Sequence, residues 1–590
     1  GHLQAIATHP KVPRPVPVEA QPAVIIDGPT RLMQQDESAQ DDDGDADAMA
    51  PKPQDASTTE DDDDDFVQTG GTRAMTLQEA LLLVEPASTP ANRATFPMLT
   101  KRNDNVPAAV ELLRNPADRS EAARDQLGRL QTVIDAAARL AADESTGACS
   151  PYGKREPDHD KRCVQLVTGG VSGYCEVADP ATGEHFRVMQ VNCSSVRDHV
   201  TFSCAQATDF ANFGLQSQDI LAKALHAPAG QLLGSKGSGD GIVMVVYPKL
   251  MTSAYASVSV LRSYGCELPI ELWVSEAELI RNPSMKDSLA LLQQRFGGVR
   301  VETIRDPSIF GFNTKIHAVY HSSFENVLFL DADNVPVRDP TFLFSSPEFE
   351  SHAAVFWPDF WHPSKTIFNI HAESLLWELV DMPFVDMFEQ ESGQLLINRR
   401  KSAVALEVLM FYQYHRPNHF EKLVLAHGDK DLFRLAWLKT ETPFYMIPFP
   451  PGAAGAVRKT TFCGMTMVQF DADGEVLFLH RNARKLLGKV DHMDGKYWEY
   501  LQTFNRHVVN ASSAANERER LMSYEDIKQQ YIIGIQGSAP LFKEFESCYG
   551  AEPEAIQNFN LTRFEDLPFK DLEDRLVNYA HEAALLTQTG

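Results

Sequence analysis

Two aspartates, Asp331 and Asp333, directly follow a short apolar run at residues 326–330. The run is too short for a helix and has the length of a buried strand. In open α/β sheets, ligands bind at the carboxyl ends of the strands. Two carboxylates one residue apart can hold Mg²⁺ or Mn²⁺ there, with other coordination positions left for water and phosphate. The sequence therefore predicts a divalent metal site at Asp331 and Asp333.

The same three letters, D-A-D, occur again at residues 471–473, and such a triplet is also ordinary turn chemistry. Gly474 follows the second triplet, and apolar runs at 467–470 and 475–479 flank it. Asp-Gly between two such runs is typical of a β-hairpin. The second triplet is therefore interpreted as a turn and the first, at 331–333, as a site.

Other residues that could do chemistry have structural alternatives. Gly393 precedes an apolar run at 395–398, where a glycine lets the backbone approach a ligand closely. Asp429 precedes a helical pattern, where an aspartate is usually only an N-cap. His480 ends the predicted hairpin, and a lone histidine there is more often structural than a ligand.

Two tryptophans, Trp357 and Trp361, lie near a predicted strand end. They could form a surface that stacks on sugars, or they could pack in the core. The sequence leaves both alternatives open.

The elements that must position these residues alternate between strand and helix. This alternation predicts an α/β fold with a mostly parallel sheet and helices on both faces. No G-x-G-x-x-G or Walker lysine loop occurs, so neither a dinucleotide site nor a P-loop is supported. The predicted strands are 242–247, 270–274, 299–304 and 326–330, and the predicted helices are 254–261, 284–294 and 402–414.

Charge and composition separate an N-terminal segment from the rest. The chain has 590 residues and a formal net charge of -27, so it lacks the basic surface of a nucleic-acid-binding protein. Residues 36–65 hold fourteen acidic side chains and one lysine. Such a segment buries too little apolar surface to fold, so residues 1–72 are expected to be a disordered acidic stem. The expected organisation continues with a helical and cysteine-rich extension (73–235), a catalytic domain (240–514) and a C-terminal helical wrap (515–590).

Cysteine usage and acceptor sites indicate an oxidising compartment. Eight cysteines, an even number without a C-x-x-C pair, favour disulfides over a zinc site, although the sequence cannot choose the pairing. N-glycosylation triplets begin at Asn192, Asn510 and Asn560. No run of eighteen apolar residues could span a bilayer. The chain begins Gly1-His2 without a methionine, so we expect a piece of a longer protein, with any N-terminal membrane anchor outside this sequence.

Several strings in this order resemble a known family. They are F-G-F-N-T-K, S-S-F-E-N-V-L-F-L-D-A-D-N-V-P, E-S-G-Q-L-L-I-N-R-R-K-S, G-D-K-D-L-F-R-L-A-W and F-L-H-R-N, within about residues 240–490. Together they resemble the GT-A fold glycosyltransferases, and most closely the fungal-type α-mannosyltransferases of glycosyltransferase family 71. The resemblance implies a GT-A-like, Rossmann-type sheet flanked by helices. It also implies residence in the Golgi lumen as a type II membrane protein.

The resemblance implies roles for the residues around the metal. Asp331 and Asp333 match the family's metal-binding pair, and His480 matches a third ligand that comes from a late strand. Lys315 matches a basic position that contacts the donor's diphosphate or base. Asp331 is expected to contact the donor as well as the metal. The implied cofactor is Mn²⁺ or Mg²⁺, and the implied donor is GDP-mannose.

The resemblance also implies residues that face the sugars. Gly393 and Gln394, together with Glu391, match the loop that faces the donor sugar. Asp431 falls where an acidic residue faces the acceptor or the donor sugar, and Asp429 is its near rival. Asp431 and Glu391 are therefore the candidate catalytic residues, and Asp429 is a candidate donor contact.

The function that follows as an expectation is a metal-dependent, retaining transfer of mannose from GDP-mannose to a mannose-containing glycan or glycoprotein, which would build mannan branches. One alternative keeps the GT-A fold but uses a UDP-sugar donor. Another is a secreted carbohydrate-binding protein without catalysis. Asp331, Asp333 and His480 together argue against that last alternative, because a lectin does not need to bind a diphosphate.

Overall fold

The structure is a computed structural model that describes part of the chain. The described residues are 141–146, 160–162, 166–168, 174–178, 185–188, 197, 200–203, 207–372, 374–506, 522–537, 542 and 547–588. The acidic segment 1–72, which the sequence predicts to be disordered, lies outside them, as do the acceptor sites Asn192 and Asn510.

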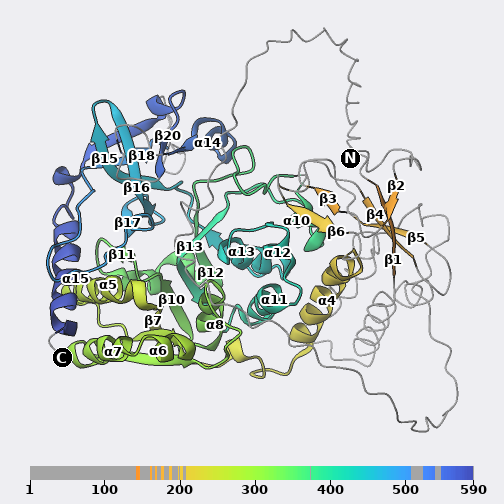
Figure 1. Ribbon diagram of the computed structural model, residues 1–590, viewed down its shortest axis with the longest axis horizontal. Coiled ribbons are helices and arrows are strands. Elements are labelled where there is room, and N and C mark those ends of the chain that lie inside the picture. Colours follow the sequence, from red (N-terminus) through yellow and green to blue (C-terminus); the bar gives the residue numbers. More distant parts are fainter. Residues whose placement is uncertain are drawn as a thin grey trace, which may run out of the picture. The chain divides into compact units, whose positions relative to one another are not determined.

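A seven-stranded sheet carries the first D-A-D triplet. In sheet order its strands are β14 (Phe444–Met446), β12 (Ala354–Pro358), β13 (Gln390–Asn398), β10 (Asn326–Leu330), β7 (Asp240–Val245), β8 (Ile270–Ser275) and β9 (Val299–Ile304). Strand β13 runs antiparallel to both of its neighbours, and every other pair in this sheet is parallel. The predicted α/β class with a mostly parallel sheet is confirmed (Figure 1).

Both faces of this sheet are buried, which explains the continuous apolar runs. In β10, Val327 and Phe329 enter one core, whereas Leu328 and Leu330 enter another. Such burial on both faces produces a continuous apolar run instead of an alternating pattern. Helices α8 (Asn313–His321), α11 (Ala403–Tyr414) and α13 (Lys430–Lys439) pack in the first core, and α5 (Met251–Ser263) and α7 (Ser284–Arg295) pack in the second.

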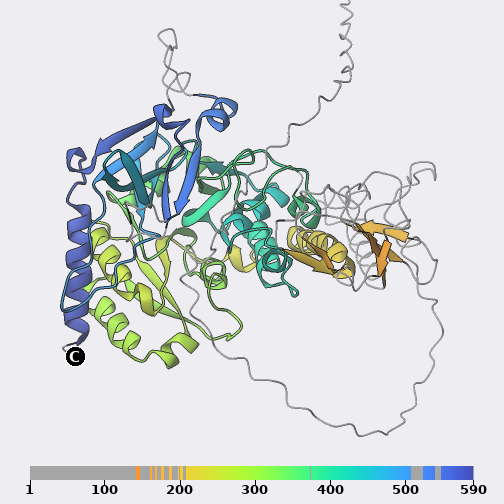
Figure 2. The same ribbon diagram turned by 45° about the horizontal axis from the view of Figure 1, so that its top comes forward.

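A second, antiparallel sheet lies to one side of the first (Figures 1 and 2). In sheet order its strands are β11 (Asn334–Pro336), β17 (Val476–His480), β16 (Thr461–Phe470), β15 (Gly452–Arg458), β18 (Tyr500–Phe504) and β21 (Phe559–Arg563). Strand β20 (Ser547–Ala551) also pairs with β16, and β19 (Ile533–Gly537) pairs with β20. Between β16 and β17, Gly474 adopts a positive φ of 87°, and Asp471 Oδ1 accepts hydrogen bonds from the amides of Asp473 and Glu475. The predicted hairpin turn at the second D-A-D triplet is confirmed.

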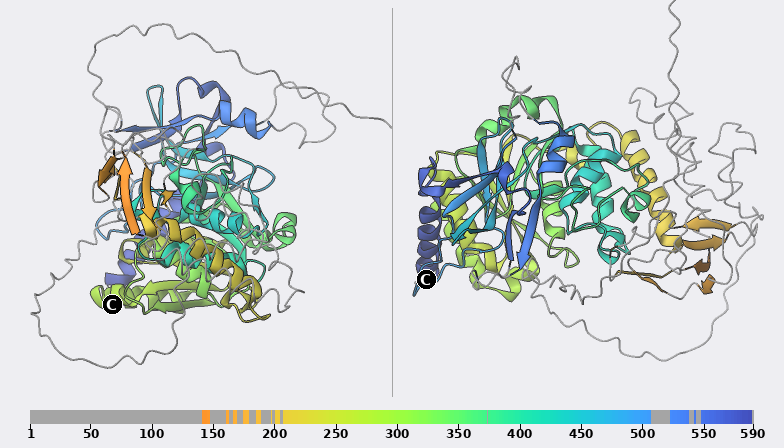
Figure 3. Two further views of the ribbon diagram at one scale, coloured as in Figure 1. Left: turned by 90° about the vertical axis from the view of Figure 1, so that its right-hand side faces the viewer. Right: turned by 90° about the horizontal axis from the view of Figure 1, so that it is seen from above.

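The remaining described elements are helices and two small sheets. Helix α15 (Leu572–Gln588) runs alongside α5, where Leu576 and Ala580 share a core with Ala256 and Val260 (Figure 3). The other helices are α4 (Ala207–His226), α6 (Glu276–Arg281), α9 (Pro347–Ser351), α10 (Leu375–Leu379), α12 (His419–Lys422) and α14 (Tyr524–Gln530). Two small sheets pair β1 (Ala141–Thr146) with β2 (Asp160–Arg162) and β4 (Tyr174–Ala178), β4 with β5 (His185–Val188), and β3 (Leu166–Thr168) with β6 (Thr201–Ser203).

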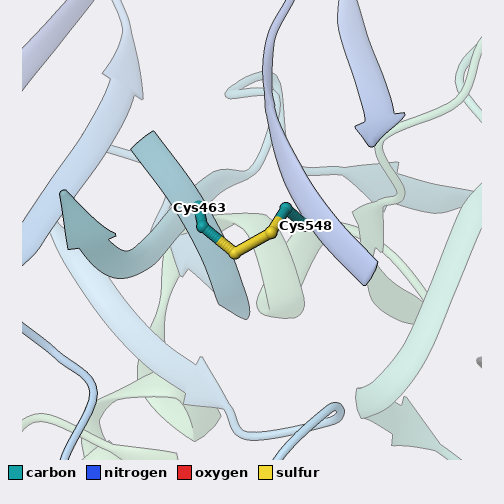
Figure 4. Close-up of a disulfide and its surroundings, with 2 residues drawn as sticks. All are labelled: Cys463 and Cys548. Carbon is teal, nitrogen blue, oxygen red and sulfur yellow. A yellow bond between two sulfur atoms is a disulfide. The ribbon is translucent and has the colours of Figure 1, made fainter. Parts of the chain in front are cut away.

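One disulfide is described, between Cys463 on β16 and Cys548 on β20 (Figure 4). Cys266 is a free, buried thiol. Cys149, Cys163, Cys193 and Cys204 lie outside the described residues, and the side chain of Cys175 is not described. Among the described helices, none combines the length and apolar character that a membrane span needs.

The two tryptophans that the sequence left open belong to the core. Trp357 is completely buried and donates its indole N–H to the carbonyl of Phe470, and Trp361 is 2% exposed. Neither ring is accessible to a sugar, so the core-packing alternative holds.

Candidate active site

The two sheets meet at the first D-A-D triplet, and their junction brings His480 to the aspartates. The chain leaves the seven-stranded sheet at the end of β10 and enters the second sheet at Asn334. Strand β11 pairs antiparallel with β17, and Asn334 lies opposite His480 in that register. As a result His480 Nε2 lies 3.3 Å from Asp333 Oδ1 and 3.8 Å from Asp331 Oδ2. The three side chains that the sequence predicts as a metal site therefore lie together.

Strand β13 completes this cluster from the other side. Its Glu391 Oε1 lies 3.4 Å from His480 Nδ1 and accepts a 2.6 Å hydrogen bond from the amide of Gly393. A Cβ atom on Gly393 would lie only 2.5 Å from His480 Nδ1 and 2.8 Å from Glu391 Oε1. The glycine is required at this position because the imidazole ring occupies the space that a side chain would fill.

Lys315, in the first turn of α8, enters the cluster beside Asp331. Its Nζ atom lies 3.2 Å from the Asp331 carboxylate and donates to the carbonyl and hydroxyl oxygens of Ser392 at 3.0 Å each. The same Nζ lies 3.6 Å from Asp429 Oδ2. Asp429 stands at the N-cap position of α13, but its side chain makes no capping hydrogen bond. Its carboxylate faces Lys315, so simple helix capping does not describe its role.

The structure adds a second lysine that the sequence analysis missed. Lys485, on the segment after β17, lies 3.7 Å from Asp333 Oδ2 and donates to the hydroxyl of Tyr247 at 3.2 Å. Tyr247 follows β7 at the carboxyl end of the sheet, where ligands of open α/β sheets bind. No local motif marks either residue. The only available signal was the position of Tyr247 at the end of the first predicted strand, 242–247.

Burial and ion pairing together control the protonation of the cluster. Although burial alone would lower the pKa of His480, Asp333 and Glu391 raise that pKa to about 10. Burial likewise opposes ionisation of Asp333 and Glu391, but the charge of His480 dominates and lowers the pKa of each to about 2. Burial raises the pKa of Asp429 to about 6 despite the opposing charge of Lys315. The carboxylates of Asp333 and Glu391 therefore favour the protonated form of the His480 imidazole, which raises its pKa.

These residues fit a hard divalent cation. Asp331, Glu391 and His480 each offer a ligand atom, and these atoms lie within 4.8 Å of one another, with Asp333 next to them. Carboxylate oxygens and imidazole nitrogen suit Mn²⁺. A histidine that binds a metal ion must be neutral. With His480 neutral, the carboxylates of Asp331, Asp333, Glu391 and Asp429 and the ammonium groups of Lys315 and Lys485 sum to a formal charge of minus two. A divalent cation would balance that charge.

Gln394, the residue after Gly393 on β13, has a buried polar side chain. It is completely buried, and its Oε1 accepts a 2.6 Å hydrogen bond from Asn334 Nδ2. Asn334 Nδ2 also donates to the carbonyl of Gly393 at 2.8 Å, which ties β11 to β13. Among the described residues Gln394 Nε2 has no hydrogen-bond partner. Buried amide donors are normally satisfied, so this unpaired atom is unusual, but Gln394 is completely buried and its predicted contact with the donor sugar stays a prediction.

Asp431 lies in a different buried network. It is completely buried, accepts a 2.6 Å hydrogen bond from Arg434 Nε and accepts another from the amide of Gln390 at 3.1 Å. In the part of the chain that the structure describes, no hydrogen bond or ion pair joins Asp431 to Asp331 or His480. Its predicted catalytic role stays a prediction, and its contacts are those of a buried ion pair.

Lys430 forms a further network that the sequence analysis did not identify. It pairs with Asp359 at 2.5 Å and with Glu389 at 3.3 Å, and its Nζ lies 4.1 Å from the centre of the Phe368 ring. Burial, only partly offset by Lys430, raises the pKa of Glu389 to about 7. Lys430 also contributes to lowering the pKa of Glu391, so the two networks interact electrostatically.

Comparisons with known proteins identify relatives of this region. Residues 239–471 match the model of a family described as "Mannosyltransferase putative". The α-1,2-mannosyltransferase MNN24 of Candida albicans is 29% identical over 244 residues, which cover 35% of this chain and 34% of that protein. The α-1,2-mannosyltransferase MNN2 of Saccharomyces cerevisiae is 28% identical over 281 residues, which cover 41% and 47%. The chain thus spans less than half the length of these relatives.

Solved structures that resemble the chain include two glycosyltransferases. The galactosyltransferase LgtC, in a complex with donor and acceptor sugar analogues, has a TM-score of 0.23 and 15% identity, and the match covers 35% of this chain and 73% of that chain. Mouse xyloside xylosyltransferase 1 has a TM-score of 0.24 and 16% identity, with 35% and 85% covered. Residues 239–471, the part of the chain that matches the family model, carry Asp331, Asp333 and Glu391.

Proposed function

We propose that this protein is a glycosyltransferase that moves mannose from GDP-mannose to a mannose-containing glycan or glycoprotein, with a divalent cation at the donor's diphosphate. The observation that supports this proposal most strongly is the meeting of Asp331, Asp333 and His480 at the junction of the two sheets. The family match and the mannosyltransferase relatives support mannose as the transferred sugar.

The cation would be Mn²⁺ or Mg²⁺, held by Asp331, Asp333 and His480, with Glu391 close enough to contribute an oxygen. When bound, such an ion acts as a Lewis acid that stabilises the charge of the departing diphosphate. Lys315 and Lys485 lie beside the two aspartates, and their positive charges would bind and orient the same diphosphate.

The sugar would lie against β13. Gly393 and Gln394 stay the candidate donor-sugar contacts that the resemblance implies, and Gly393 leaves the space that the His480 ring fills. Glu391 and Asp431 stay the candidate catalytic carboxylates, and Asp429 a candidate donor contact. A diphosphate leaving group needs no general acid, unlike the leaving group of a glycosidase. Transfer with retention could therefore proceed without a second opposed carboxylate.

The proposed setting is the Golgi lumen. The disulfide between Cys463 and Cys548 supports an oxidising compartment. Asn560, a glycosylation acceptor on β21, is exposed and therefore accessible.

A panel of nucleotide sugars tests the proposal. The purified protein is melted with Mn²⁺ and GDP-mannose, UDP-glucose or UDP-galactose, and release of nucleoside diphosphate is measured for each. GDP-mannose should raise the melting temperature most, because a ligand that binds only the folded state stabilises it. It should also be the donor that is consumed in the presence of mannose oligosaccharides. Preference for a UDP-sugar would replace the donor assignment, and stabilisation without any diphosphate release would indicate a binding protein.

Asp333→Ala tests the metal assignment. The variant should lose metal-dependent transfer and still fold, because Asp333 would coordinate the ion. Full activity of Asp333→Ala in excess chelator would refute the assignment.

A further inference from the structure

Two large aromatic side chains are exposed in the loop between β9 and α8. Phe310 is 60% exposed and Phe312 is 50% exposed. Single exposed apolar side chains are common, but neighbouring ones beside a functional site mark a surface that binds something. Both rings belong to the F-G-F-N-T-K string, of which the proposed function uses only Lys315.

The loop presents these rings from a fixed backbone. The amide of Asn313 donates to the carbonyl of Phe310 at 3.2 Å, and Thr314 Oγ1 donates to the carbonyl of Gly311 at 2.7 Å. The hydroxyl of Tyr414, on α11, donates to the carbonyl of Asn313 at 2.6 Å. These hydrogen bonds hold the backbone that carries the two exposed rings.

Contacts place Phe312 beside the candidate active site. Its ring packs on Gly428, where an added Cβ atom would lie 3.2 Å from Phe312 Cγ. The next residue, Asp429, faces Lys315 at 3.6 Å. The ring centre of Phe312 also lies 6.2 Å from that of His427. The exposed aromatic surface is thus continuous with the residues that surround the carboxylate cluster.

This surface lies on the opposite face of the sheet from Tyr247. Tyr247 packs against the core that contains Leu328, whereas α8, which follows Phe312 directly, packs through Ile316 in the core that contains Phe329. Lys315 and Lys485 would hold the diphosphate between the two faces, and a nucleoside bound after the first strand would then lie on the Tyr247 side. The aromatic surface is left for the other substrate.

We infer that Phe310 and Phe312 form a binding surface for the acceptor saccharide of the proposed transfer. That the bound saccharide is the acceptor rests on the proposed function. Binding of a saccharide by the two rings can be measured without any transfer. A pyranose presents a face of C–H groups that packs on an aromatic ring, while its hydroxyl groups need polar partners at the edge. His427, whose ring lies next to that of Phe312, is such a partner.

The test uses alanine variants of the full chain and one matched control. Phe310→Ala, Phe312→Ala and the double variant are compared with Phe342→Ala, whose ring is 39% exposed on the 3₁₀ turn Pro340–Ser345, on a different segment of the chain. Saturation-transfer NMR measures binding of linear α-mannotriose to donor-free protein, and initial rates give KM for mannotriose and for GDP-mannose. Phe312→Trp retains an aromatic surface.

The double variant should lose the mannotriose NMR signal and raise the acceptor KM at least tenfold. Its donor KM and its release of GDP without acceptor should stay within twofold of wild type. Phe312→Trp and Phe342→Ala should resemble wild type. If the double variant gives the same mannotriose saturation-transfer signal as the wild type, the inference is wrong. It is also wrong if the wild type does not bind mannotriose.

A rise in donor KM with an unchanged acceptor KM would instead assign the rings to the donor and overturn the inference. A changed oligomeric state in the double variant would show that another copy of the chain covers the rings, which also overturns it. If the protein consumes no nucleotide sugar, the proposed function is wrong. The NMR comparison still tests whether Phe310 and Phe312 bind a saccharide.

Discussion

Replacing Gly393 by alanine tests the geometry on which the candidate site depends. The new methyl carbon would lie 2.5 Å from His480 Nδ1, 2.7 Å from His480 Cε1 and 2.8 Å from Glu391 Oε1. Ordinary carbon contacts begin at 3.4 Å, so the imidazole must move by about 1 Å. The backbone of β13 cannot move instead without loss of its pairing with β10.

A displacement of about 1 Å in a positioned group reduces the rate on the order of 100-fold, equivalent to about 2.7 kcal/mol of transition-state stabilisation. We therefore expect Gly393→Ala to retain about 1% of the wild-type rate and to bind Mn²⁺ more weakly. Initial rates of GDP release and calorimetric titration with Mn²⁺ measure these two effects. Gly297→Ala is the control, because an added Cβ atom there meets nothing within 4 Å.

A double-variant cycle separates this mechanism from general misfolding. If the alanine acts through the histidine, Gly393→Ala combined with His480→Ala should be no slower than His480→Ala alone. Additive losses would show that the methyl group disturbs something other than the ring. Wild-type rates and Mn²⁺ affinity in Gly393→Ala, with an unchanged melting temperature, would refute the proposed position of His480.

Three further predictions follow from individual contacts. Lys485→Ala should raise the KM for GDP-mannose about tenfold, or about 1.4 kcal/mol, because its ammonium lies 3.7 Å from Asp333; an unchanged donor KM would remove Lys485 from the donor site. Burial lowers the pKa of His419 to about 4, so the folded state does not take up the proton that the unfolded state binds near pH 6.5. The free energy of unfolding should therefore fall by up to about 3 kcal/mol between pH 6.5 and 4, and His419→Phe should flatten that fall in urea titrations; equal slopes would contradict the assignment. Replacing Cys463 and Cys548 together by alanine should lower the free energy of unfolding by about 4 kcal/mol, because the disulfide joins residues 85 positions apart. A loss below about 1 kcal/mol in urea titrations would show that the disulfide hardly restricts the unfolded chain.

Local patterns in the sequence predicted the central sheet because each strand is buried on both faces. The run at residues 326–330 contains only one polar residue, Asn326, and the structure sends alternate side chains of that run into two cores. The same local reasoning separated the two D-A-D triplets. Gly474 supplies the positive φ that the hairpin turn needs, whereas no glycine follows Asp333.

Local patterns could not predict which charged groups face one another. Asp429 has the sequence position of a helix cap, yet its carboxylate faces Lys315 from another helix. Lys485 follows the last strand of a hairpin without any motif, yet it lies beside Asp333. Trp357 was equally compatible with a sugar surface and with the core until burial decided between them.

The sequence by itself determined the strand that precedes the two aspartates and the hairpin that carries His480, because strand burial and turn signals are properties of neighbouring residues. It placed Glu391, Gly393 and Gln394 on a loop, whereas the structure puts them in strand β13. Only the tertiary structure decided that His480 meets Asp331 and Asp333, since this contact depends on the pairing of β11 with β17 across a long stretch of chain. It also decided why Gly393 must be a glycine, because the atom that excludes a side chain there comes from a distant strand. Contacts between distant segments follow from the register of a whole sheet, and no short stretch of sequence contains that register.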